Sequence, residues 1–252
     1  MPIPRFYVPD LNPAEIGKTV PLAGELAHHL TVRRLRTGEP IRLFDGQGRE
    51  WEGILLGNGR GLPNACRLVA TVTPLPEPRQ PRVLATALLP ADRLDWVVQK
   101  GVELGMTHWV PLVTTYSQVG FSAERAQKKF AHWTKIAAHA AAQCGRATVP
   151  RLLPPTSLYD LPERLAQDGL SDVAWFWAQP GGVSFAAVPC PSRGVLLAIG
   201  PEGGWHPDEA AWLAARPATA IGLAPWVLRA ETAAVTVLAQ ALVAFANSGE
   251  GG

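Results

Sequence analysis

A glycine-rich turn in the last quarter of the chain is the first segment that could hold a ligand. Residues 195–204 read Val-Leu-Leu-Ala-Ile-Gly-Pro-Glu-Gly-Gly, which predicts a buried strand entering a tight turn. Glycines let backbone N–H and C=O groups approach a ligand closely, and ligands usually bind beyond the carboxyl ends of parallel strands. The spacing matches neither a P-loop nor GxGxxG, so it predicts no phosphate cradle. A plain strand-to-helix turn stays open as the alternative.

A second segment carries two charges in apolar surroundings. Residues 222–233 read Gly-Leu-Ala-Pro-Trp-Val-Leu-Arg-Ala-Glu-Thr-Ala, in which Arg229 and Glu231 are the charged residues. A fixed guanidinium could stabilise negative charge as it develops on a substrate. The alternative interpretation is a surface arginine beside an acid that the dipole of the following helix favours.

Basic residues gather in two further regions and favour a polyanionic partner. Six lysines and arginines lie within residues 125–151 without an acid among them, whereas an ordinary solvated helix face mixes both signs. A second cluster runs from His28 to Arg36, and Arg5 could join it. His28 and His29 are adjacent, and no third ligand stands at a suitable spacing, so the sequence predicts no metal site.

The elements that must position these residues divide into two predicted domains. Residues 1–73 contain short apolar runs separated by turn signals, which predicts a small β-barrel or sandwich. Residues 74–81 hold four prolines in eight residues, a stiff linker. Residues 82–248 alternate between apolar strands and helices, which predicts a parallel α/β sheet covered on both faces. The strands are expected at 5–8, 41–44, 51–56 and 67–72, then at 83–89, 108–113, 173–177, 195–199 and 220–223. The helices are expected at 92–104, 122–143, 208–215 and 230–245.

The composition describes a folded chain with a sizeable core. Hydrophobic residues make up 47% of the 252 residues, charged residues make up 17%, and the formal net charge is +2. Three cysteines without CxxC spacing argue against a disulfide scaffold. The N-terminus lacks the apolar region of a signal peptide, and the longest apolar stretch, residues 232–245, is too short to span a bilayer. We therefore expect a cytoplasmic protein without a membrane segment.

Several ordered motifs resemble the RsmE family, ribosomal RNA small-subunit methyltransferase E. The strongest are Gly-Pro-Glu-Gly-Gly at 200–204 and Leu-x-x-x-Val-Leu-Arg-Ala-Glu-Thr at 223–232. Further matches are Arg-Phe-Tyr-Val at 5–8, His-His-Leu at 28–30, Gly-Glu-Pro-Ile-Arg-Leu-Phe-Asp-Gly at 38–46, Gln-Lys-x-x-Glu-Leu-Gly at 99–105 and Gln-Cys-Gly-Arg-x-x-x-Pro at 143–150. Together they extend over most of the chain, which makes the resemblance specific.

The resemblance implies a fold, a cofactor and a reaction. The fold would be an N-terminal PUA-like β-barrel and a C-terminal SPOUT-type α/β domain tied in a deep trefoil knot, with a homodimer formed through the knotted domains. S-adenosyl-L-methionine would lie in the knot crevice, and no metal would be required. The reaction would be methylation of N3 of one uridine, position 1498 in the usual numbering, in 16S rRNA of the assembled small ribosomal subunit.

The resemblance also implies roles for individual residues. Arg229 is the first catalytic candidate and Arg146 the second. The cofactor-binding candidates are Leu197, Ile199, Gly200, Pro201, Glu202, Gly203, Gly204, Leu223, Ala224, Pro225, Trp226, Val227 and Leu228. The RNA-binding candidates are Arg5, His29, Arg34, Lys100, Arg125, Lys128, Lys129 and Arg146.

One departure from the family pattern and the identity of a general base leave alternatives open. Trp226 stands where the family usually has an arginine, which puts a role for that first arginine in doubt. Glu202 and Glu231 could act as a general base, although orienting a loop or capping a helix is the favoured interpretation. The competing functions are methylation of another rRNA or tRNA base by the same fold, and an inactive RNA-binding assembly factor.

Overall fold

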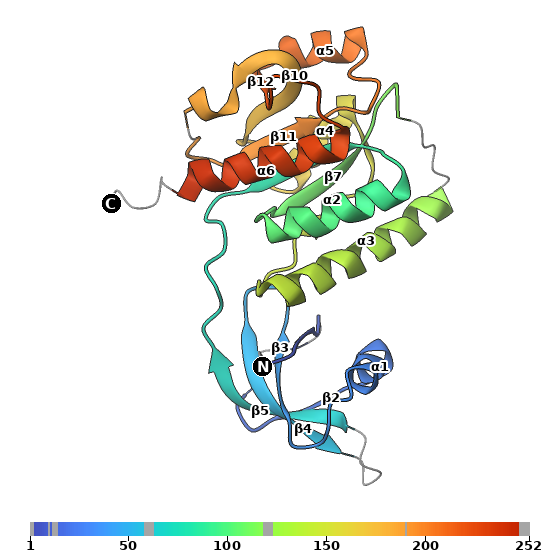
Figure 1. Ribbon diagram of the computed structural model, residues 1–252, viewed down its shortest axis with the longest axis vertical. Coiled ribbons are helices and arrows are strands. Elements are labelled where there is room, and N and C mark those ends of the chain that lie inside the picture. The colour runs from blue at the N-terminus through green and yellow to red at the C-terminus, as the bar shows by residue number, and fades with distance from the viewer. Residues whose placement is uncertain are drawn as a thin grey trace. The chain divides into compact units, whose positions relative to one another are not determined.

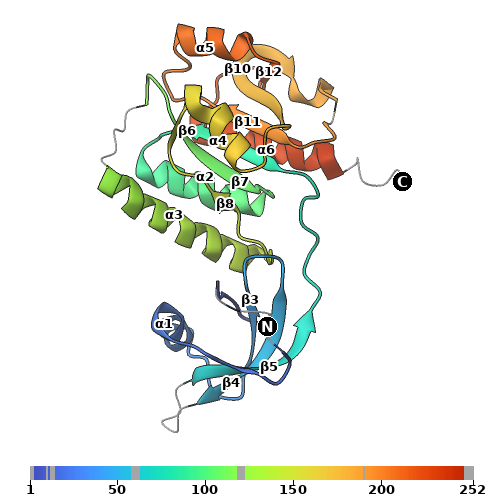
Figure 2. The same cartoon turned by 180° about the vertical axis from the view of Figure 1, so that it is seen from behind.

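The computed structural model describes residues 3–9, 11, 15–57, 63–117, 123–189 and 191–246. They form two compact units (Figures 1 and 2). Unit 1 comprises Met1–Glu77 with Ala138–Val149, and unit 2 comprises Pro78–Ala137 with Pro150–Gly252. The long helix α3 (Ala123–Cys144) contributes residues to both units, so a segment of the predicted C-terminal domain clusters with the N-terminal strands.

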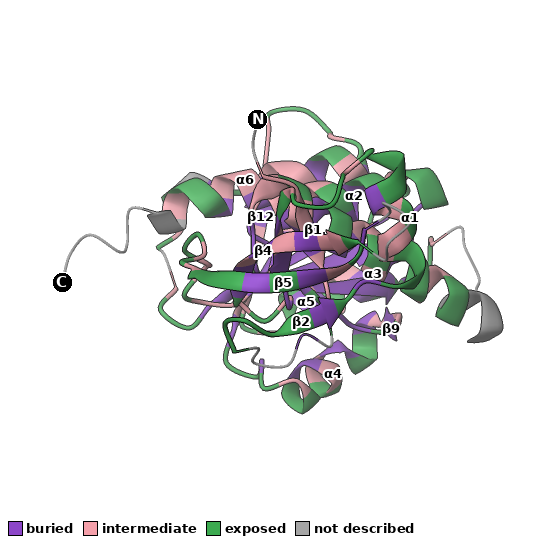
Figure 3. Ribbon diagram, turned by 90° about the horizontal axis from the view of Figure 1, so that it is seen from below, coloured by how far each residue is buried: buried purple, intermediate pink, exposed green. Residues whose placement is uncertain are grey.

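Unit 1 contains a five-stranded sheet in the order β1-β3-β4-β5-β2. The strands are β1 (Arg5–Tyr7), β2 (Thr19–Pro21), β3 (Pro40–Phe44), β4 (Glu50–Gly57) and β5 (Pro63–Val72), and the helix α1 (Gly24–Val32) follows β2. Strand β1 pairs parallel with β3, and the remaining pairs are antiparallel. Along β5, buried residues are interspersed with exposed ones (Figure 3). This pattern places one face of the sheet on a core around Leu30, Leu43 and Leu55.

Unit 2 is a seven-stranded parallel sheet in the order β12-β10-β11-β6-β7-β8, with β9 also paired to β7. Its strands are β6 (Arg82–Ala87), β7 (His108–Val113), β8 (Arg151–Leu152), β9 (Thr156–Ser157), β10 (Ala174–Ser184), β11 (Val195–Ile199) and β12 (Ala218–Gly222). Every residue of β6 and β11 is buried, which explains why these central strands are uniformly apolar apart from Arg82 and Thr86.

Helices cover both faces of this sheet, as Figures 1 and 2 show from opposite sides. Helices α2 (Ala91–Glu103) and α6 (Ala230–Ala246) pack together, and α6 contacts β6 and β11. Helices α4 (Leu161–Gln167) and α5 (Pro207–Ala214) bury Leu165 and Leu213 against Val83 and Leu196. Short 3-10 turns occur at Leu158–Asp160 and Phe185–Ala187. The predicted α/β fold with a parallel sheet is confirmed.

Several expected boundaries need correction. No strand or helix was predicted at β2, α1, β8, β9 or α4. Strands of two or three residues are too short to show a period, and α1 has only one buried residue, Leu30. Strand β10 continues to Ser184 rather than ending at residue 177, because a bulge between Ala178 and Val183 lets it stay paired with β12. The first residue of the helix expected at 122–143 lies outside the described residues.

Within the described part of the chain, no helix is long and apolar enough to cross a membrane.

Candidate active site

A cavity of about 350 Å³ opens in unit 2 where β11 and β12 end and α6 begins. This volume falls within the range of roughly 300–1,000 Å³ that is typical of small-molecule sites. The two segments singled out in the sequence meet here, because β11 and β12 flank β10 in one parallel sheet and end at the same edge. The lining residues are Ala178, Gln179, Pro180, Ile199, Gly200, Pro201, Glu202, Gly204, Trp205, Ile221, Leu223, Ala224, Trp226, Val227, Leu228, Arg229, Ala230 and Ala233.

Two glycines of the loop that follows β11 have a specific structural reason. A Cβ atom on Gly200 would lie 3.0–3.2 Å from the indole ring of Trp205, so the ring packs directly over this backbone. Gly204 has φ +74°, a left-handed conformation that side chains with a Cβ rarely adopt. The Trp205 Nε1–H donates to the carbonyl oxygen of Ala178 at 3.0 Å, which ties the loop to the bulge in β10.

A buried carboxylate fixes the helix that follows the same loop. Glu209 is 1% exposed, and its Oε1 accepts hydrogen bonds from the backbone N–H of Thr115 at 2.7 Å and from the Thr115 hydroxyl at 3.1 Å. Its Oε2 accepts from the backbone N–H of His206 at 3.0 Å, and the His206 ring accepts from Asp208 N–H to complete a capping box. The turn after β7 and the start of α5 are therefore held together beside the glycine loop.

An arginine that the sequence analysis did not select joins the two acidic candidates. Arg93 on α2 forms an ion pair with Glu202 of the glycine loop, and its Nε lies 3.9 Å from Oε1 of Glu231 on α6. The three side chains are partly shielded from solvent. This arrangement fits the orienting role that the sequence favoured for both acids, and no local pattern in α2 could have marked Arg93.

Most of the predicted cofactor-binding residues come together in the cavity, and three do not line it. Leu197 is fully buried inside β11, Gly203 lies against Tyr116, and Pro225 is exposed. The lining residues that the sequence analysis missed are Ala178, Gln179, Pro180, Trp205, Ile221, Ala230 and Ala233. Ala178, Gln179 and Pro180 come from the bulge of β10, a backbone feature that has no signal in the sequence.

Comparisons with known proteins agree with this site. A family model described as an RNA methyltransferase domain matches residues 76–242, and one described as an RNA methyltransferase PUA domain matches residues 22–62. The ribosomal RNA small subunit methyltransferase E of Bacillus subtilis (strain 168) is 30% identical over 242 residues, which cover 93% of this chain and 94% of that protein. This chain belongs to the RsmE family. The protein of the same name from Mycobacterium bovis is 31% identical over 238 residues, covering 92% of this chain and 88% of the relative.

Solved structures of RsmE and its relatives share the fold of this chain. The ribosomal RNA small subunit methyltransferase E of Neisseria gonorrhoeae, bound to S-adenosyl methionine, superposes with a TM-score of 0.83 at 30% identity, covering 94% of this chain and 95% of that one. A methyltransferase of Legionella pneumophila in complex with the same cofactor superposes with a TM-score of 0.86 at 28% identity, covering 97% and 98%. The predicted family and the PUA-plus-α/β architecture are confirmed.

One predicted RNA contact of this RsmE-family chain is better explained as a structural tie. The guanidinium of Arg5 donates through Nε and Nη2 to Glu50 at 2.9 Å each, and Nη2 also donates to the carbonyl oxygen of Arg146 at 3.1 Å. Its Nη1 donates to the carbonyl oxygens of Ala141 and Ala142 at 3.0 Å each, near the C-terminal end of α3. An arginine has five N–H donors, and these bonds use all of them. Arg5 therefore holds α3 to β1 and β4, and the expectation of a phosphate contact is corrected.

Two further basic candidates are engaged with acids. The buried guanidinium of Arg146 pairs with Glu77 in unit 1, with Nη2 and Nε at 2.7 Å and 2.9 Å from Oε2. The Lys100 ammonium lies 2.8 Å and 2.9 Å from the two carboxylate oxygens of Glu103. This is an ordinary ion pair between helix residues at i,i+3 spacing. Each pairing competes with an RNA phosphate for the same N–H groups.

The remaining basic candidates are more open to solvent. Arg34 is exposed directly after α1, with φ 55°, and His29 is half-buried on α1. Lys128 is exposed and Lys129 half-buried on α3. The side chain of Arg125 lies outside the described residues. These positions stay predictions for RNA contact.

Proposed function

We propose that this protein methylates N3 of one uridine in 16S rRNA, at position 1498 in the usual numbering, with S-adenosyl-L-methionine as the methyl donor. The observation that carries the proposal is the cavity at the ends of β11 and β12, with the exposed guanidinium of Arg229 on its wall. Two solved structures that share the fold, at 30% and 28% identity, are described as methyltransferases and contain this cofactor. A ribosomal RNA substrate is consistent with a place in the cytoplasm.

The cavity fits the proposed cofactor in size and in lining. Apolar side chains such as Ile199, Leu223 and Leu228 could face an adenine ring, and the backbone at Gly200 and Gly204 carries no Cβ atom. S-adenosyl-L-methionine, when bound, supplies an electrophilic methyl group that needs no metal ion for its activation. The contribution of the chain is then mainly to orient the donor and the acceptor nitrogen.

Arg229 is proposed to stabilise the charge of the acceptor. When uridine N3 loses its proton, the negative charge spreads to O2 and O4, and a guanidinium beside these oxygens lowers the barrier. The carbonyl oxygen of Arg229 accepts a hydrogen bond from the Ala233 N–H at 2.8 Å, so the first turn of α6 fixes this backbone. Arg146 stays the second candidate, although in the described structure it pairs with Glu77.

Glu202 and Glu231 are proposed to position Arg93 and the glycine loop rather than to act as a base. The contacts of both carboxylates with the Arg93 guanidinium support this positioning role. Trp226 is 70% exposed on the cavity wall and replaces the family arginine. Its exposed ring could stack on a base turned out of the RNA, because every base has a π-face.

The family resemblance extends the proposal to the assembly. We expect the SPOUT knot at the two loops that line the cavity, and a homodimer formed through the α/β domains. The substrate is proposed to be the assembled small subunit. The exposed Arg34 and Lys128 and the half-buried Lys129 would contact the phosphates of the rRNA.

The test is methylation of a defined substrate. Purified protein is incubated with labelled S-adenosyl-L-methionine and either unmodified small subunits or naked 16S rRNA, and the product is mapped by mass spectrometry. N3-methyluridine at one site supports the proposal. Methylation of another base or of tRNA would replace the substrate, and cofactor binding without transfer to any of these RNAs would favour the inactive assembly factor. Absence of cofactor binding would overturn the assignment of the cavity.

A further inference from the structure

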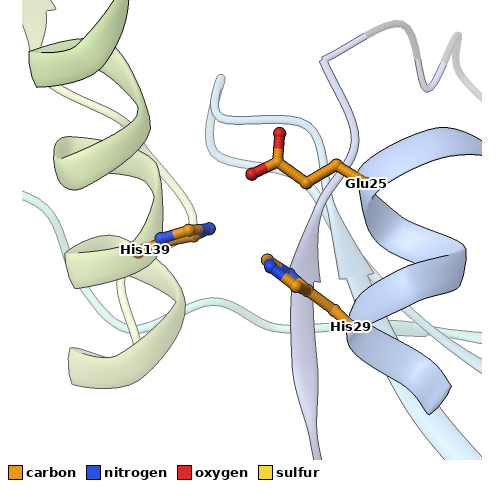
Figure 4. A group of neighbouring side chains, drawn as sticks. All are labelled: Glu25, His29 and His139. Carbon is orange, nitrogen blue, oxygen red and sulfur yellow. The ribbon is translucent and has the colours of Figure 1, made fainter. Parts of the chain in front are cut away.

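Unit 1 brings together three side chains that could hold a metal ion. Glu25 and His29 lie on α1 and His139 lies on α3, and one ligand atom from each falls within 4.8 Å of the others. Figure 4 shows the three side chains directed toward one another from the two helices. The His29 and His139 rings have centroids 5.2 Å apart. The sequence predicted no metal site here, because His139 stands 110 residues after His29 in the chain.

The backbone explains why these side chains meet. Glu25 and His29 are separated by four residues on α1, so they share one face of that helix. His139 lies in the segment Ala138–Val149 of unit 1, which begins within the last part of α3. Arg5 holds this end of α3 by donating to the carbonyl oxygens of Ala141 and Ala142 at 3.0 Å. The end of α3 is therefore placed by contacts that do not involve the three side chains.

We propose that Glu25, His29 and His139 form a site for Zn²⁺ or a similar divalent transition-metal ion. Two imidazoles and one carboxylate are the donor set that such ions prefer, whereas Mg²⁺ and Ca²⁺ prefer oxygen ligands alone. Bonds of 2.0–2.1 Å in a tetrahedral arrangement put donor atoms about 3.3 Å apart, so the side chains must close slightly from their present spacing. Glu25 and His139 are exposed and His29 is half-buried, which leaves them room to do so.

The proposed ion has a structural consequence. Its bonds to α1 and to α3 clamp the two helices together, with solvent water in the fourth position. Helix α1 leads directly into the exposed basic residues Arg33, Arg34 and Arg36. A bound metal ion would therefore hold in place the helix that precedes this candidate RNA surface. The proposed metal site lies in unit 1, whereas the lining of the cofactor cavity lies in unit 2.

The alternative is an ion-paired polar cluster that joins the two helices without metal. The deciding experiment uses the full chain without an affinity tag, stripped of metal and titrated with ZnCl₂ by isothermal calorimetry. We expect one Zn²⁺ per chain. We expect the Zn²⁺ affinity to fall by at least about 10-fold in each of the variants His29→Ala, His139→Ala and Glu25→Gln. Mutation of residues that only hydrogen-bond to a metal ligand already costs about 10-fold, and a direct ligand should cost no less. Glu25→Gln keeps the shape of the side chain and so guards against a folding defect.

Two matched controls keep the result specific. His28→Ala removes an exposed histidine next to His29, and His132→Ala removes one from α3 that pairs with Asp95 at 2.8 Å, so both should leave the Zn²⁺ affinity unchanged. Zn²⁺ should also raise the melting temperature of the wild-type chain and of these controls, because a ligand that binds only the native state stabilises that state. It should not raise the melting temperature of His139→Ala, which lacks one of the proposed ligands. The proposal fails if the chain binds no Zn²⁺, or if the variants at Glu25, His29 and His139 bind it as tightly as the wild type.

Discussion

The carboxylate of Glu209 accepts a hydrogen bond at 2.7 Å from the backbone N–H of Thr115, a residue 94 positions earlier in the chain. This bond and the one from His206 N–H at 3.0 Å join the turn after β7 to the loop that lines the cavity. Replacing Glu209 by alanine removes a buried carboxylate and leaves these partly buried N–H groups without an acceptor. We expect a loss of about 1–3 kcal/mol in the free energy of unfolding, the usual desolvation penalty, and weaker binding of S-adenosyl-L-methionine.

Urea unfolding and calorimetric titration measure both effects. Asp208→Ala is the matched control, since the Asp208 side chain is 83% exposed on the same helical turn. If Glu209→Ala binds the cofactor as the wild type does, the loop does not depend on this carboxylate.

Arg229→Ala tests the proposed charge stabilisation. Removing a group that stabilises an oxyanion commonly lowers kcat by about 10²–10³-fold, and we expect a loss of that order with little change in cofactor affinity. Single-turnover methylation of small subunits measures the rate, and equilibrium dialysis measures the affinity. Arg193→Ala, at an exposed arginine paired with Asp172, should leave both unchanged. An unaltered rate for Arg229→Ala would remove this residue from the mechanism.

Gly204→Ala separates backbone strain from ligand binding. Gly204 and Gly169 have nearly the same left-handed conformation, with φ +74° and +73°, and a Cβ atom on either would meet nothing within 4 Å. Both alanine variants should therefore lose about 1–2 kcal/mol of stability, the cost of a Cβ in the left-handed region. Only Gly204→Ala should also weaken cofactor binding, because Gly204 lines the cavity. Equal cofactor affinities for the two variants would contradict the loop assignment.

Arg5 and Arg34 should give opposite results although both were candidates for RNA contact. Arg5→Ala leaves the buried carboxylate of Glu50 unpaired, so we expect a loss of about 3–5 kcal/mol in the free energy of unfolding. Arg34→Ala removes an exposed side chain, so we expect almost no change in stability and weaker binding of rRNA with a smaller salt dependence. Chemical denaturation and filter binding at several salt concentrations distinguish them. Wild-type stability of Arg5→Ala would show that the tie is dispensable.

His108 predicts how stability depends on pH. Burial, and next the positive charge of Arg151, lower the pKa of His108 below its ordinary value, while Asp168 acts in the opposite direction. The unfolded chain therefore binds a proton at His108 first as the pH falls through about 6.5, and the native state loses stability below that pH. The slope of the unfolding free energy between pH 5 and 8 should become smaller in His108→Gln.

Strand bounds and motifs that are local in the chain could be predicted from the amino-acid sequence alone. The strands β7 and β11 have the predicted bounds, since a run of apolar residues between turn signals marks a strand that is buried on both faces. The two motifs at 200–204 and 223–232 pointed to the cavity, because the ends of parallel strands in one sheet meet at one edge.

Contacts between residues that are far apart in the sequence are seen only in the three-dimensional structure. The bulge that brings Gln179 to the cavity depends on the register of β10 against β12, and the pairing of Arg93 with Glu202 depends on how α2 packs. His139 reaches His29 because α3 ends within unit 1. Local periodicity reports which face of an element is buried, but it carries no information on register or on contacts between elements far apart in the chain.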